Sequence, residues 1–146
     1  GIIDIIATDH APHTLAEKTR PYPNSPAGMP GVETSLPLML TAMQAEQCTL
    51  AQVQQWMCSG PARVYGIKNK GQLAEGFDAD LALVDIETMR PVRDNEMFSR
   101  AAWSPYAGRE LTGWPSHTIV GGQVVFDNGR IRPGVFGKAL EFSRPD

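Results

Sequence analysis

The chain opens with an apolar run that ends abruptly in polar groups, and this feature limits the possible folds most. The run from Ile2 to Ala7 is rich in β-branched side chains and is followed at once by Thr8-Asp9-His10. A strand that is apolar on both faces normally has neighbours on both sides. The pattern therefore predicts a buried parallel strand over residues 2–8. In α/β barrels the chemistry lies at the C-terminal ends of such strands.

The next part of the sequence predicts a loop followed by helices. Residues 14–34 are interrupted by many prolines and glycines, and we expect an ordered active-site loop there. Apolar periodicity predicts a helix over residues 34–47, with Pro37 in its first turn. Thr49 and Gln52 have the spacing of a capping box, which predicts a helix through about residue 58. We expect a break at residues 59–61 and then a short further helix.

The character of the sequence changes near residue 68, where strand-forming segments take over. Residues 80–86, 116–120 and 123–126 are rich in β-branched and aromatic side chains, and the last two are separated by two glycines. Asp127-Asn128-Gly129 is typical of a second tight turn. We therefore predict two parts: residues 1–67 as barrel-like α/β material, and residues 68–146 as a β-rich tail.

Composition excludes several classes of protein. The chain has 146 residues, 42% of them hydrophobic, and a net charge of -3, so no basic surface is expected for nucleic acid. No apolar run reaches the roughly 20 residues that span a bilayer. Cys48 and Cys58 are expected to be free thiols in a reducing compartment, which favours a cytoplasmic protein.

One short segment gathers most of the groups that could carry chemistry. Ala7 to His13 reads ATDHAPH and places one carboxylate and two imidazoles within five residues. Such a group can bind a metal, move a proton or hold an anion. Asp9 follows an apolar strand directly, so its carboxylate is expected to face a cation or a hydrogen-bond donor.

Three stretches of the sequence resemble the dihydroorotase branch of the amidohydrolase superfamily. They are ATDHAPH with Glu17-Lys18, PAGMPGVET over residues 26–34, and the tail with GQLAEGFDADLALVD over residues 71–85 and SPYAGRELTGWP over residues 104–115. The first motif is typical of dihydroorotases, whereas the strand signature in the tail is shared across amidohydrolases. The resemblance covers nearly the whole chain.

The resemblance implies a fold, a reaction and roles for four residues. The fold is the C-terminal part of a (β/α)8 barrel, with the eighth strand, its loop and closing helices, followed by part of a small β-sandwich domain. The reaction is the reversible hydrolysis of dihydroorotate to N-carbamoyl-L-aspartate in pyrimidine biosynthesis, with two zinc ions. Asp9 is expected to bind metal and act as the general base. His13 and the Ala27-Gly28 backbone are expected to hold the carboxylate of the substrate.

The other metal ligands of that family cannot be placed in this sequence. The family's first-strand His-x-His pair, carboxylated lysine and two further histidines have no counterpart here, and Asp9 alone cannot hold a metal. The chain also begins with Gly1 rather than Met. We therefore expect a piece of a longer enzyme, inactive in isolation and partnered by the missing N-terminal barrel segment, in a protein that is expected to be a homo-oligomer. The alternatives are a hydantoinase- or allantoinase-like enzyme, or a non-catalytic amidohydrolase-like subunit.

Other polar and aromatic residues are expected to have structural roles. His10 is expected to support the surroundings of Asp9 rather than to bind metal. His117 is expected to be a surface or packed histidine, and Asp78 and Asp80 to cap a turn. A last group of residues is expected to cover the barrel or a subunit contact: Trp103, Tyr106 and Trp114.

Overall fold

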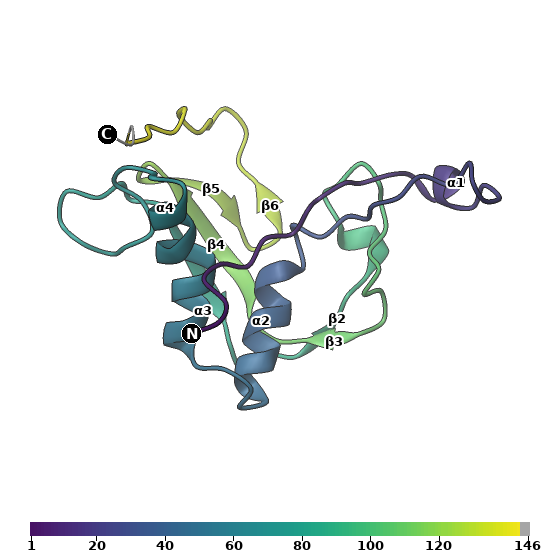
Figure 1. Ribbon diagram of the computed structural model, residues 1–146, viewed down its shortest axis with the longest axis horizontal. Helices are drawn as coiled ribbons and strands as arrows, with labels where there is room; N and C mark the ends of the chain where they lie inside the picture. Colours follow the sequence, from purple (N-terminus) through teal and green to yellow (C-terminus); the bar gives the residue numbers. More distant parts are fainter. Residues whose placement is uncertain (144–146) are drawn as a thin grey trace.

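The computed structural model describes residues 1–143 and contains short helices, a four-stranded sheet and a two-stranded sheet (Figure 1). The helical elements are α1 (Leu15–Lys18), α2 (Ser35–Gln44), α3 (Leu50–Gln54), the π-helical η1 (Gln55–Ser59), α4 (Gly60–Val64) and the 3₁₀ turn η2 (Asp94–Glu96). The strands are β1 (Leu81–Asp85), β2 (Arg90–Pro91), β3 (Glu110–Leu111), β4 (Trp114–Val120), β5 (Gln123–Asp127) and β6 (Arg130–Ile131). This mixture of helices and sheets agrees with the expected α/β class.

The first segment of the chain differs from the prediction, because residues 2–8 do not form a strand. A strand exists only through hydrogen bonds to a neighbouring strand. Among residues 1–143 the backbone N–H of Ile6 instead donates to the carbonyl of Trp56 in η1, over 3.0 Å. Ile2 and Ile3 are consequently exposed. Figure 1 shows this segment crossing the molecule as an extended arm that leads to α1, away from the other helices.

The helices follow the predicted N-terminal signals. The helix expected over residues 34–47 is α2, and Pro37 is buried in its first turn. Thr49 and Gln52 form the predicted capping box at the start of α3, with both reciprocal hydrogen bonds present. The first helix, α1, was not predicted, although Thr14 and Glu17 have the same capping spacing. Its single turn is too short to produce an apolar periodicity.

The predicted break at residues 59–61 is wrong, because the helical path continues from α3 through η1 into α4. Pro61 has no N–H to donate, and its ring would clash with a carbonyl of a regular helix. The wider π turn accommodates this, and the Gly60 N–H donates to the carbonyl of Gln55. Gly60 is buried, and a Cβ there would lie 2.5 Å from the carbonyl oxygen of Asp4. The lack of a side chain at Gly60 thus lets the arm pass directly over the helix.

The predicted strands and turns are confirmed in the tail. The larger sheet has the order β1-β4-β5-β6, and every pair is antiparallel. Gly121 and Gly122 both have positive φ in the turn between β4 and β5, as do Asn128 and Gly129 between β5 and β6. Turns of this kind match the right-handed twist of the strands that they join.

The buried core is shared by the parts of the chain on either side of residue 68. Leu40 of α2 and Leu111 of β3 are almost completely buried. The N–H of Thr112 donates to Oγ1 of Thr41 over 2.9 Å, which fixes α2 against the strand. The division at residues 67 and 68 stays a prediction. Across residues 1–143, no helix combines the length and the apolar composition needed to cross a bilayer.

The contact between α2 and Gly113 leads to a first prediction. Gly113 has φ +84°, and a Cβ there would lie 2.3 Å from Cβ of Leu40. Gly113→Ala should lower the free energy of unfolding by about 2–4 kcal/mol, from overpacking and backbone strain together. Gly134→Ala is the control, with φ +80° and no atom within 4 Å, and should cost only about 1 kcal/mol. Urea unfolding measures both, and equal losses would contradict the packing argument.

Candidate active site

The segment from Asp9 to His13 is held against the loop that carries Gly28. His10 and Met29 form an isolated parallel bridge, and the Ala11 N–H donates to the carbonyl of Met29 over 3.2 Å. Asp9 lies just before this bridge, with φ +39° and an exposed side chain. Positive φ is uncommon outside glycine, although aspartate tolerates it better than most residues. The bridge therefore aligns two segments of the predicted site that are about twenty residues apart.

His10 fixes the start of the chain that leads into α2. Its Nδ1 accepts hydrogen bonds from the backbone N–H groups of Gly31, at 3.1 Å, and Val32, at 3.3 Å. An acceptor at Nδ1 requires the proton of the neutral ring to be on Nε2. This contact fits the supporting role that the sequence predicts for His10.

The Gly28 loop is held by a lysine and by close backbone packing. Nζ of Lys18 donates to the carbonyls of Pro26, at 2.8 Å, and Gly28, at 3.0 Å. Gly28 has φ +90°, and a Cβ there would lie 2.7 Å from Cβ of Ala11. Only glycine satisfies both conditions without a shift of the backbone. The predicted close approach at Gly28 is thus made by the chain itself.

Two open hollows lie beside this segment, and the predicted residues divide between them. Asp9 and Gly28 line a hollow of about 430 Å³, together with Thr8, Lys18, Met29 and Trp103. His13 lines a second hollow of about 340 Å³, whose wall also includes His10, Glu17 and Arg100. Ala27 is exposed and lines neither hollow. The structure thus brings Asp9 and Gly28 together and places His13 on an adjoining surface.

The single turn of α1, beside His13, favours the ionised form of the Glu17 carboxylate. The Glu17 side chain accepts from the backbone N–H and the hydroxyl of Thr14, both over 2.8 Å. The backbone hydrogen bond is the main reason that the pKa of Glu17 is lowered, and the hydroxyl adds to it. The wall beside His13 therefore includes a carboxylate that stays ionised below its ordinary range.

Trp103 is the main site residue that the sequence did not assign. We expected it to cover the barrel or a subunit contact, but its indole lines the Asp9 hollow and its Nε1 donates to the His13 carbonyl over 2.7 Å. Trp103 lies 90 residues from His13 in the chain, so no spacing rule relates the two. The only available signal was that an indole N–H needs an acceptor when it is partly buried.

The described residues do not by themselves make a metal site. Among residues 1–143 there is no group of three or more histidine, cysteine, aspartate or glutamate side chains arranged to hold a metal ion. Catalytic zinc sites use about three protein ligands. The exposed carboxylate of Asp9 has the chemistry of one such ligand. It accepts no hydrogen bond and forms no ion pair within the described part of the chain.

The remaining candidates are occupied in structural contacts. His117 lies between Ser116 and Asp127, with its Nε2 3.3 Å from Oδ1 of Asp127. Asp80 pairs with Lys70 and accepts from the Gly121 N–H at 2.7 Å, and these bonds hold its pKa below the ordinary value. Asp78 also pairs with Lys70, at 2.9 Å. These contacts agree with the predicted structural roles.

Comparison with known protein families identifies the family to which the chain belongs. The model of the amidohydrolase family matches residues 1–125, which include the arm, both hollows and most of the larger sheet. The chain belongs to the amidohydrolase family. This confirms the family that the motifs indicated.

Curated relatives and solved structures agree with this membership. The chain is 37% identical over 132 residues to a dihydroorotase of Methanothermobacter thermautotrophicus, and 42% identical over 131 residues to one of Bacillus caldolyticus. These matches cover 90% and 89% of the chain but only 31% and 30% of the relatives. A solved L-hydantoinase (dihydropyrimidinase) from Arthrobacter aurescens is 33% identical with a TM-score of 0.88, covering 96% of the chain and 32% of that structure. The chain thus spans about a third of the length of these proteins.

The close packing of Gly28 can be tested directly. Gly28→Ala should push the two segments apart and weaken the Ala11 to Met29 hydrogen bond, so the Ala11 amide should exchange with deuterium about tenfold faster. Gly31→Ala is the control, because its Cβ would lie 3.5 Å from the nearest atom, in ordinary contact. Unchanged exchange in Gly28→Ala would show that the close approach is not maintained in solution.

The Thr14–Glu17 capping box predicts a dependence on pH. Because the pKa of Glu17 is lowered in the folded state, its contribution to stability is present above the unfolded pKa and is lost as pH falls through the folded one. Thr14→Ala should raise the pKa of Glu17 only part of the way, since the backbone hydrogen bond remains. Thr14→Ser keeps the hydroxyl and should leave the pKa unchanged. Carbon-13 NMR titration of the Glu17 carboxyl measures both, and identical titrations would refute the role of the hydroxyl.

Proposed function

We propose that this chain forms part of a hydrolase of cyclic amides, and that its substrate is dihydroorotate. The observation that carries the proposal is Asp9, an exposed carboxylate that lines the same open hollow as Gly28. The dihydroorotases among the relatives match about 90% of the chain. The chain covers about a third of those relatives, so the proposed activity belongs to the complete enzyme.

In this proposal Asp9 is the general base. A water molecule attacks the ring carbonyl, and Asp9 takes the proton that the water loses. The ring C–N bond then breaks, and Asp9 passes the same proton to the leaving amide nitrogen. The product carries a free amide and a new carboxylic acid, which releases the second water proton to solvent and becomes a carboxylate, as in N-carbamoyl-L-aspartate. Proton transfer of this kind typically contributes about 10²- to 10⁴-fold to a rate.

His13 and the Ala27-Gly28 backbone are proposed to hold the substrate's carboxylate. His13 and Arg100 line the same hollow, so an imidazole and a guanidinium are available to an anionic ligand there, while the Glu17 carboxylate of the same wall is bound by Thr14. Gly28 lines the hollow that contains Asp9. A substrate that spans the adjoining hollows would place its amide near Asp9 and its carboxylate near His13.

Zinc is proposed as the cofactor of the complete enzyme, with Asp9 as one ligand and the others outside this chain. When bound, zinc would polarise the ring carbonyl and lower the pKa of the attacking water. The described residues contribute the carboxylate of Asp9, and its exposure leaves it accessible to an ion.

The proposal also places the chain at the end of a (β/α)8 barrel followed by part of a β domain. Its support is the apolar arm, because Ile2 and Ile3 are exposed in this chain and would be covered by neighbouring strands of the complete barrel. The order of elements, helical first and β-rich afterwards, is consistent with that arrangement.

A hydantoinase is the second candidate, favoured by the solved L-hydantoinase that matches 96% of the chain with a TM-score of 0.88. The two candidates differ in whether the ring substrate carries a carboxylate. The test is to supply the full-length, zinc-loaded enzyme with dihydroorotate, 5,6-dihydrouracil and hydantoin, and to measure ring opening by chromatography. We expect the highest kcat/KM with dihydroorotate. Preference for hydantoin or dihydrouracil would reject the dihydroorotase assignment.

The role of Asp9 predicts a specific loss of turnover. Asp9→Asn in the full-length enzyme should lower kcat by at least about 10²-fold, because the amide cannot accept the proton. Asp4→Asn is the matched control, since Asp4 is an exposed aspartate in the same arm, and its side chain forms an exposed pair with Arg63 at 3.7 Å. This variant should leave kcat within about twofold. A fully active Asp9→Asn enzyme would exclude Asp9 as the base.

A further inference from the structure

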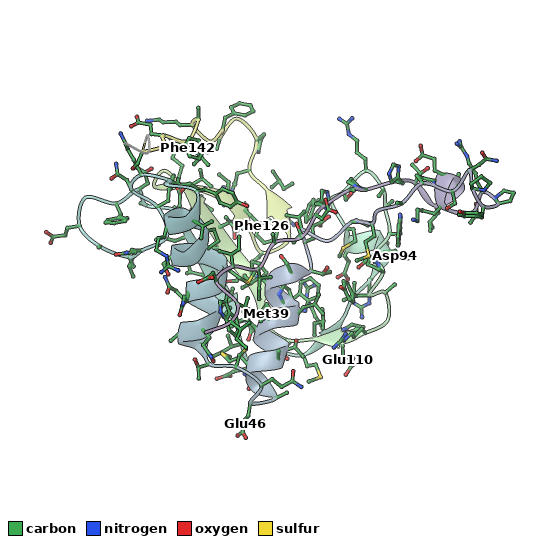
Figure 2. All side chains as sticks on the ribbon, in the orientation of Figure 1. Met39, Glu46, Asp94, Glu110, Phe126 and Phe142 are labelled. Carbon is green, nitrogen blue, oxygen red and sulfur yellow. The ribbon has the colours of Figure 1, made fainter. Side chains whose placement is uncertain are left out.

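The loop after η2, residues 97–104, is tied to the candidate site by buried and charged contacts. The Glu33 carboxylate, just before α2, accepts from the backbone N–H groups of Phe98 and Ser99, each over 2.8 Å. Hydrogen bonds to an ionised group are stronger than neutral ones. At the other end of the loop, Oδ1 of Asp94 accepts from the N–H of the buried Ser104 over 2.8 Å. Figure 2 shows Asp94, in η2 just before this loop, on the side of the molecule where the arm runs out to α1.

These ties direct Trp103 into the site. Its Nε1 lies 2.7 Å from the carbonyl oxygen of His13, a short hydrogen bond in a partly buried position. Its ring lines the Asp9 hollow and, on another side, packs with His10 and Glu33 around a space of only about 10 Å³. The indole is therefore fixed from several directions, and it fixes the His13 backbone in turn.

The Trp103 bond restrains the peptide that carries His13. The Ala11 N–H bond lies two residues before His13, and the Thr14 capping box begins one residue after it. Between these two anchors, the Trp103 indole makes a direct hydrogen bond to the backbone of His13. The peptide plane between His13 and Thr14 is held on both sides, because its carbonyl accepts from Trp103 and its N–H donates to the Glu17 carboxylate over 2.8 Å. Loss of the Trp103 bond would leave this plane held on one side only, and would loosen the position of His13 on the wall of the second hollow.

We propose that Trp103 is a positioning residue that sets the location of the His13 imidazole and thereby the affinity for a carboxylate-bearing cyclic amide. This inference rests on the proposed function, since it gives His13 the substrate's carboxylate to hold. The loop of residues 97–104 thus influences substrate selection by fixing the position of His13, and it supplies no reacting group.

The chain offers a matched control for this idea. Trp114 also donates its Nε1 to a backbone carbonyl, that of Leu111, over 2.9 Å. Its ring stacks under the guanidinium of Arg90, 4.2 Å from the ring centroid, and lines neither hollow of the site. Phenylalanine at either position keeps an aromatic ring and removes the same kind of hydrogen bond.

The experiment compares Trp103→Phe and Trp114→Phe in the full-length, zinc-loaded enzyme. Trp103→Phe should raise KM for dihydroorotate about fivefold and change kcat by less than about twofold, because binding is disturbed and the base is not. Trp114→Phe should leave KM unchanged. Hydrogen exchange of the peptide that spans residues 10–18 should be faster in Trp103→Phe alone.

The outcomes separate this inference from the proposed function. An unchanged KM in Trp103→Phe, a fall in kcat at constant KM, or equal effects of the two variants would overturn the positioning role. If the wild-type enzyme does not open dihydroorotate, the proposed function has failed. The exchange measurement then decides by itself: faster exchange in Trp103→Phe supports the hold on His13, and unchanged exchange refutes it.

Discussion

Two indole N–H groups hold the ends of an arm that has no strand beside it in residues 1–143, and the candidate site depends on this. Trp56 donates to the carbonyl of Ile3 over 3.0 Å, and Trp103 donates to the carbonyl of His13 over 2.7 Å. Between them the arm presents Asp9, and the Ala11 to Met29 bond joins it to the Gly28 loop. The arm is thus placed by a few directional bonds rather than by a buried apolar face. Each of these bonds therefore has a large influence on the geometry around Asp9.

Local signals predicted much of the fold. The paired glycines after Val120 and the Asn128-Gly129 pair marked the two hairpin turns, because few other residues accept positive φ at successive positions. The spacing of Thr49 and Gln52 marked the start of α3, because it allows the two reciprocal hydrogen bonds of a capping box. The strand expected at residues 2–8 and the break expected before Pro61 were wrong. The strand needed hydrogen-bond partners on a neighbouring strand, which a local pattern does not contain. The break was avoided by the i to i−5 hydrogen bonding of a π turn, which a pattern based on regular helices does not anticipate.

The candidate site was predictable to a similar extent. The motif ATDHAPH identified Asp9 and His13, and the glycine of the loop pointed to Gly28, which does approach the arm. Neither the motif nor its spacing showed that His13 lies beside a different hollow from Asp9. The sequence also did not associate Trp103 with the site, and it gave Glu33, within the expected loop, no role of its own. Both act through backbone groups of distant residues, and such contacts place no requirement on the identity of the residue that receives them.

The π turn at η1 has an evolutionary consequence for the arm that crosses it. Gly60 packs against the carbonyl of Asp4 so closely that any side chain there would have to displace either the helix or the arm. Among homologues, a larger residue at this position should therefore occur only together with a regular helical turn at residues 55–59 or with a different path for the arm. We therefore expect homologues either to share all three features, which are Gly60, the π turn and the path of the arm, or to lack them together.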